Sequence, residues 1–174
     1  MIINSHALLV AAPIVDMVQG KMVGPGGTSF GLSEAGYDIR IKQEIVFAAN
    51  SQGCGPHILV QAPELARQPG WGKKGRFALA SAMEEFQMPD NLVGIVHDKS
   101  TWARKGLSVF NTVIEPGWNG FLTLELVFHG HEDLIIPAGS GIAQVIFHET
   151  AVRTRYTGKY QNQEDKPVSA IDSK

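Results

Sequence analysis

The chain has 174 residues, 44% hydrophobic and 18% charged, a composition typical of one folded domain and not of a disordered chain. Its formal net charge of −2 excludes an overall basic field, so neither nucleic acid nor a membrane surface is an expected partner. The single cysteine, Cys54, excludes an internal disulfide and a zinc cage of several thiolates, and favours a reducing, cytoplasmic setting.

Most of the chain is predicted to form short strands in a single domain over residues 1–174, with a flexible tail from about residue 152. The alternation of apolar and polar residues over 37–45 predicts a half-buried strand with Ile39 and Ile41 on one face. Apolar runs between turns predict further strands over residues 58–60, 77–82, 92–97, 107–114, 121–128, 134–136 and 142–148. This spacing predicts an all-β fold, a distorted β-barrel or jelly-roll-like sandwich.

Helices and loops are predicted for the remaining sequence. Residues 7–18 favour a short helix, although Pro13 interrupts the pattern. Residues 100–105 favour a helical turn that Ser100 or Thr101 could cap. Loops are predicted over residues 24–31, 49–56, 63–76 and 88–91.

Four segments, in order along most of the chain, resemble one known family. They are GYDIR at 36–40, KSTWARKGL at 99–107, IEPGWNGFLTLE at 114–125 and KYQNQ at 159–163. Together they resemble the dCTP deaminase branch of the dUTPase-like superfamily. The resemblance implies a dUTPase-like distorted barrel or jelly roll, assembled as a homotrimer with its sites at subunit interfaces.

The resemblance also implies a reaction, the zinc-independent hydrolytic deamination of dCTP to dUTP and ammonia. Glu125 matches the family's catalytic glutamate, and Ser100 and Arg104 match residues that position the water and that glutamate. One carboxylate can move protons to and from the reacting groups if its pKa is raised toward neutrality. The alternative deaminase chemistry needs zinc on histidine and cysteines, which a chain with one cysteine cannot supply.

The substrate's triphosphate calls for cations and neutral donors at a helix start. An acid at the Glu115 position holds the deoxyribose 3′-hydroxyl in the family, and Lys159 and Gln163 could close over the nucleotide from the tail. The residues expected to bind substrate are Lys99, Ser100, Thr101, Arg104, Glu115, Thr123, Tyr156, Lys159 and Gln163. Mg²⁺ is expected only through the triphosphate, with no metal ligand from protein side chains. The resemblance makes dTTP a candidate feedback inhibitor.

Departures from the family pattern leave alternatives open. The segment 107–114 is about two residues shorter than the resemblance predicts, and its length is closer to that of the same segment in a dUTPase. Glu115 stands where an aspartate is common, and Asp98 where a glycine is common. A dUTP pyrophosphatase, in which Glu115 activates water and Mg²⁺ bridges the phosphates, is therefore an alternative, although its Gly-rich tail motif is missing. A bifunctional enzyme taking dCTP to dUMP, a non-catalytic nucleotide sensor and a purely structural trimer module are the others.

Other polar residues are interpreted as structural. Asp38 is expected to be a buried hydrogen-bond acceptor or an interface residue. The cluster at 129–133 (HGHED) and the basic residues at 73–76 are each expected to lie in a solvated loop, as neither a metal site nor a nucleic-acid site.

Overall fold

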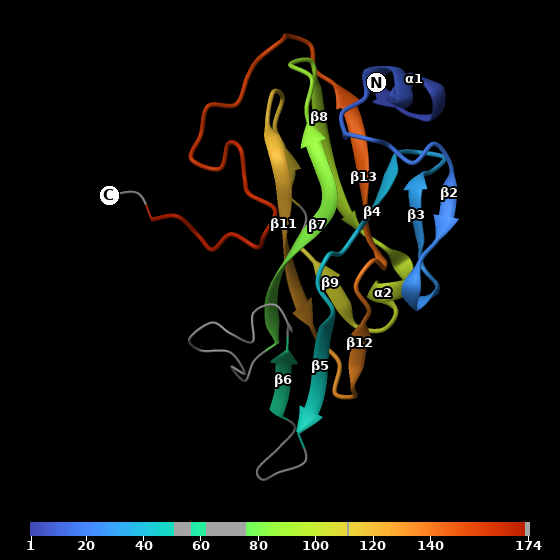
Figure 1. The fold of residues 1–174 in the computed structure, drawn as a ribbon, viewed down its shortest axis with the longest axis vertical. Helices are drawn as coiled ribbons and strands as arrows, with labels where there is room; N and C mark the ends of the chain where they lie inside the picture. Colours follow the sequence, from blue (N-terminus) through green and yellow to red (C-terminus); the bar gives the residue numbers. More distant parts are fainter. Residues whose placement is uncertain (51–56, 62–75, 111, 173–174) are drawn as a thin grey trace.

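The computed structural model describes residues 1–50, 57–61, 76–110 and 112–172 (Figure 1). Strands dominate this part of the chain, with two short α-helices and one 3₁₀ turn, Pro25–Gly27. The helices are α1 (Ser5–Ala11) and α2 (Ser100–Ala103). The strands are β1 (Ile2–Ile3), β2 (Lys21–Val23), β3 (Ser29–Leu32), β4 (Tyr37–Arg40), β5 (Ile45–Asn50), β6 (His57–Gln61), β7 (Phe77–Gln87), β8 (Leu92–Asp98), β9 (Leu107–Val109), β10 (Val113–Ile114), β11 (Asn119–Phe128), β12 (Leu134–Ile136) and β13 (Gly141–Glu149).

Three antiparallel sheets form within the described residues. The largest has the order β10-β8-β13-β4-β3-β2, with β1 paired to β13. The two smaller sheets have the orders β7-β11-β9 and β12-β5-β6. None of these sheets closes into a barrel over the described ranges, so the predicted all-β fold is confirmed in its jelly-roll-like form.

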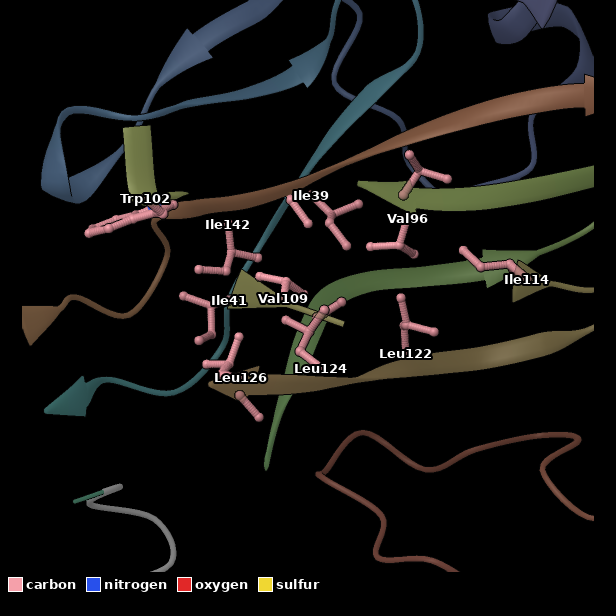
Figure 2. Close-up of a cluster of buried hydrophobic side chains, with 14 of the residues drawn as sticks. Ile39, Ile41, Val96, Trp102, Val109, Ile114, Leu122, Leu124, Leu126 and Ile142 are labelled. Atoms are coloured by element: carbon pink, nitrogen blue, oxygen red, sulfur yellow. The ribbon is translucent and has the colours of Figure 1, made fainter. Parts of the chain in front are cut away.

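The hydrophobic core lies between the largest sheet and the β7-β11-β9 sheet. Figure 2 shows Ile39, Val96 and Ile142 pointing toward Leu124 and Leu126 of β11. All five side chains are at most 1% exposed. Burying each stabilises the fold by about 1.5–3 kcal/mol, so this contact helps to hold the two sheets together.

The alternation of β11 fixes which of its side chains face outward. Leu122, Leu124 and Leu126 point into the core, while Thr123 and Glu125 lie between them on the outer face and are half-buried. Successive side chains of a strand point to opposite faces. The core contact of the leucines therefore determines the orientation of Glu125.

Buried polar side chains also join β4 to β7. The Nε and the backbone N–H of Arg40 both donate to the Glu84 carboxylate, each at 2.8 Å. Burial raises the pKa of Glu84, and the Arg40 guanidinium opposes that rise. Nearby, Gln43 and Ser81 exchange two hydrogen bonds of 2.7 and 2.9 Å. These pairs join β7 to β4 and to residues 41–43 after it, where the backbone meets β7 at the bridge between Ile41 and Ala82.

The helices are shorter than predicted. The helix expected over residues 7–18 ends at Ala11, because Ala12 adopts a left-handed conformation with φ of 46° and Pro13 follows it. The predicted caps of α2 were wrong: its N-cap residue is Lys99, and no side chain caps it. Within the described residues, neither helix is long and apolar enough to cross a membrane.

Several strand boundaries also differ from the prediction. The expected loop over 24–31 includes the first three residues of β3, since Ser29–Leu32 pairs with strands on both sides. The strand expected over 37–45 divides into β4 and the start of β5, and residues 49 and 50 belong to β5. The strand expected over 107–114 divides into β9 and β10, and β7 extends five residues beyond 82. The expected loops over 51–56 and 63–75 lie outside the described residues.

Candidate functional site

A pocket of about 540 Å³ lies on the outer face of β11. Five residues predicted to act on the substrate line it. They are Glu115, Thr123, Glu125, Tyr156 and Gln163. Strand β11, the turn before it and the C-terminal segment therefore bring together residues that are up to 48 positions apart (115 to 163).

Neighbouring strands hold Glu125 on both sides. Glu125 lies opposite Leu79 of β7, and its carbonyl accepts a hydrogen bond of 2.9 Å from the Phe110 N–H. A side chain on a central strand is held more precisely than one on a loop. Glu125 thus projects from a rigid part of the pocket.

Glu115 lies at the edge of the same pocket and is exposed. It begins the turn into β11, and its carbonyl accepts a 3.1 Å bond from the Trp118 N–H. Gly117 in this turn has φ of 70°, and a Cβ there would lie 2.5 Å from Cγ of Arg155. The turn therefore requires glycine at this position.

The C-terminal segment, predicted to be a flexible tail, runs beside β11 (Figure 1). Gln163 forms a parallel bridge with Gly120, and its carbonyl accepts a 3.1 Å bond from the Phe121 N–H. The Thr123 hydroxyl donates to the Gln163 side chain at 3.2 Å and accepts from the Val168 N–H at 3.0 Å. The segment thus forms one wall of the Glu125 pocket.

Thr123→Val is expected to loosen this wall without disturbing the strand, because valine keeps the branched shape and loses the hydroxyl. Two hydrogen bonds are lost, each worth about 0.5–1.5 kcal/mol. Hydrogen exchange of the Val168 amide should accelerate by roughly ten-fold or more. The matched control Thr112→Val also changes a pocket threonine and should leave that exchange unchanged. Unaltered Val168 exchange in Thr123→Val would show that the hydroxyl does not hold the segment.

The remaining candidates lie outside this pocket. Ser100, Thr101 and Arg104 are exposed on or beside α2. Arg104 lines a separate groove with Lys105 and His131. Lys159 is exposed, contacts the carbonyl of Ile171 and lies 5.2 Å from the Tyr160 ring centre. Within one chain, the candidate residues on and beside α2 therefore lie apart from Glu125.

Lys99 points inward. Its ammonium donates to Asp38 at 2.6 Å, and Asp38 is 2% exposed. Asp38 is therefore the buried hydrogen-bond acceptor that the sequence predicted.

The charge of the Glu125 pocket is negative. Glu115 and Glu125 are its only ionisable carboxylates, and no lysine or arginine lines it among the residues that the structure describes. Two carboxylates repel a triphosphate and can accept hydrogen bonds from the donor groups of a base and a sugar. The pocket accordingly suits the nucleoside end of a nucleotide.

The cluster at 129–133 lies at the surface. His129, His131, Glu132 and Asp133 are exposed, and Asp133 accepts a 2.6 Å bond from the Ala49 N–H. Among the described residues, no group of three or more histidine, cysteine, aspartate or glutamate side chains is arranged to hold a metal ion.

Comparison with known proteins places this arrangement in a family. A family model described as dCTP deaminase-like matches residues 14–150. The chain belongs to the dCTP deaminase-like family. Curated relatives named dCTP deaminase include one from Campylobacter curvus, 35% identical over 92% of this chain and 89% of the relative. Another, from Campylobacter jejuni, is 37% identical over 81% of each chain. A third, from Protochlamydia amoebophila, is 35% identical over 87% of this chain and 85% of the relative.

A solved structure of native EIAV dUTPase is 18% identical and has a TM-score of 0.49, covering 73% of this chain and 85% of that chain.

The dCTP deaminase-like match includes α2 and β11 and ends at residue 150. Tyr156, Lys159 and Gln163 therefore lie beyond the matched region. The placement of Tyr156 and Gln163 at the β11 pocket comes from the structure of this chain.

Sequence reasoning did not identify two aromatic walls of the pocket in this dCTP deaminase-like chain. Phe77 and Phe110 line it and are 50% and 52% exposed. A signal for Phe77 was present, because Phe77 and Leu79 alternate with the small buried residues Ala78 and Ala80. A signal for Phe110 was present as well, because alternation in the strand predicted over 107–114 puts it on the face opposite Leu107 and Val109.

Proposed function

We propose that this chain is a dCTP deaminase that hydrolyses dCTP to dUTP and ammonia. The observation that carries the proposal is the position of Glu125 in a pocket suited to a nucleoside, within a chain of the dCTP deaminase-like family. Relatives at 35–37% identity over most of the chain carry the name dCTP deaminase.

Glu125 acts as both general base and general acid. Its carboxylate takes a proton from a water as the water oxygen bonds to cytosine C4. It then delivers a proton to the amino group as the C4–N bond breaks and ammonia leaves. The second proton of the water moves to ring N3 and the water oxygen remains as the O4 of uracil, so the net reaction consumes one water and needs no redox partner.

The other candidates have supporting roles. Ser100 and Arg104 position the water and the Glu125 carboxylate, and Glu115 holds the sugar 3′-hydroxyl. Thr101, Thr123, Tyr156, Lys159 and Gln163 are the remaining proposed substrate contacts.

A second copy of the chain completes the site. Arg104 lies in a groove separate from the Glu125 pocket, and that pocket lacks a described cation for the triphosphate. Symmetric assembly can bring the α2 surface of one subunit against the β11 pocket of the next. We therefore propose a homotrimer with shared sites.

Mixing two inactive variants tests this sharing. Glu125→Gln and Arg104→Ala trimers, unfolded and refolded together at equal concentration, should regain about a quarter of wild-type activity, because one site in four receives both native residues. Each variant refolded alone is the control and should stay inactive. Mixtures no more active than the separate variants would contradict a shared site.

The metal requirement follows from the triphosphate. Mg²⁺ is proposed to bind through the nucleotide phosphates, and zinc has no role. A zinc-selective chelator should leave the rate within about two-fold, whereas EDTA should raise the KM for dCTP. Inhibition by the zinc chelator that added zinc reverses would contradict this proposal.

Ammonia release from dCTP tests the enzymatic function itself. Steady release that scales with protein concentration is expected, and dTTP is expected to inhibit it. Tight binding of dCTP without ammonia release would instead support a non-catalytic nucleotide sensor. The single cysteine is consistent with a cytoplasmic enzyme.

The second candidate is a dUTP pyrophosphatase or a bifunctional enzyme. Its supporting observation is that Glu115 lines the same pocket and is exposed, so it could activate a water. Pyrophosphate among the products would support this candidate.

A further inference from the structure

The Lys99 side chain is held by polar groups from two strands of the largest sheet, β3 and β4. It is 12% exposed, and its ammonium donates to the Asp38 carboxylate at 2.6 Å and to the Ser29 hydroxyl at 3.0 Å. Asp38 also accepts bonds from Ser29 at 2.8 Å and from Gln144 at 3.2 Å. Strands β3, β4 and β13 thus meet at one buried ion pair.

Moving the Lys99 ammonium to a phosphate would break this pair. Asp38 is 2% exposed, so the move would leave a buried carboxylate without its cation. An uncompensated buried charge is strongly unfavourable. Lys99 is therefore poorly placed to serve as a mobile phosphate contact.

The Lys99 main chain begins α2. Its carbonyl accepts bonds of 3.0 Å from the N–H groups of Trp102 and Ala103. The residues that follow include Ser100 and Arg104, the proposed partners of Glu125. The bond between the Lys99 side chain and Asp38 therefore holds the start of the segment that carries Ser100 and Arg104.

We propose that Lys99 and Asp38 are a positioning pair: the buried ion pair fixes α2 so that Ser100 and Arg104 are oriented for the reaction, and Lys99 is not a triphosphate contact. This inference rests on the proposed dCTP deaminase function. It also departs from the role that the sequence resemblance implied for Lys99.

Lys99→Met tests the two roles, because methionine keeps much of the apolar stem and removes the charge. A positioning role predicts that kcat for dCTP falls by about 10–100-fold while KM changes by less than about three-fold. A phosphate contact predicts a raised KM with kcat retained, and that result would overturn the proposal. The matched control is Lys21→Met, which breaks the exposed pair with Glu34 and should leave both constants unchanged.

The double variant Asp38→Asn/Lys99→Met tests the pairing. Both partners are then uncharged, so the loss of kcat should be no larger than in either single variant. Losses that multiply would show that the two residues act independently and would overturn the proposal.

Lys99→Arg keeps the inference testable if Lys99→Met does not fold. Arginine is a good phosphate ligand, so a phosphate contact predicts near-normal kcat and KM. The planar guanidinium presents its donors in a different geometry from the ammonium and changes the bonds to Asp38 and Ser29, so positioning predicts a lowered kcat with KM retained. If wild-type protein does not deaminate dCTP, the proposed function fails. The pair is then tested by thermal unfolding of the two single variants and the double variant. A double variant at least as stable as the less stable single variant supports the pair. Losses of stability that add in the double variant refute it.

Discussion

Glu125→Gln is expected to lower kcat for dCTP deamination by at least about 10²–10⁴-fold. Glutamine has the size of glutamate and can still hydrogen-bond to water or to the base. It cannot take the proton from the attacking water, so the chemical step is lost while the pocket keeps its shape. The measurements are kcat from ammonia release and the Kd for dCTP from calorimetry, and the Kd should change by less than about three-fold.

Glu85→Gln is the matched control. Glu85 lies on β7 beside Phe121 of β11, is half-buried and does not line the pocket. Its substitution should leave kcat unchanged. Full activity in Glu125→Gln would end the assignment of Glu125 as the general base.

Trp102→Ala is expected to lower the free energy of unfolding by about 3–5 kcal/mol. The ring is 1% exposed, its indole N–H donates to the Gly141 carbonyl at 2.7 Å, and Lys105 lies 4.8 Å from the ring centre. Truncation removes the packing and leaves a buried carbonyl without its donor. Natural domains have only about 5–15 kcal/mol in total, so the loss is a large part of the stability.

Urea unfolding measures this change, and Ile135→Ala serves as its control. Ile135 is 56% exposed, so its truncation should cost less than about 1 kcal/mol. A loss below about 1 kcal/mol for Trp102→Ala would contradict a stabilising role for the burial of this ring.

The sequence was sufficient to predict those strands that show a clear alternation of apolar and polar residues. The strand predicted over 121–128 is part of β11, and its alternation puts Leu124 inward and Glu125 outward, because side-chain direction in a strand follows directly from residue order. It was insufficient for β3, since the pairing of Ser29–Leu32 depends on strands on both sides of it. The glycines there favoured a loop on local grounds, and the sheet contacts outweighed them.

The candidate site shows the same division. The order of motifs was sufficient to select Glu115, Glu125 and Gln163, which the fold brings into one pocket. The environment of Lys99 could not be predicted, because Asp38 lies 61 residues away and only the pairing of β8 and β4 on either side of β13 brings them together. From sequence alone, a lysine just before a helix is expected to bind an anion. In the fold, Lys99 is instead buried beside the Asp38 carboxylate and pairs with it.

Chromatography of the products from dCTP and, separately, from dUTP, each with Mg²⁺, tests the central claim most directly. The account predicts that dCTP gives dUTP and ammonia while dUTP stays intact. Unchanged dCTP together with conversion of dUTP to dUMP and pyrophosphate would contradict it, and Glu115 would then become the residue to test as the base.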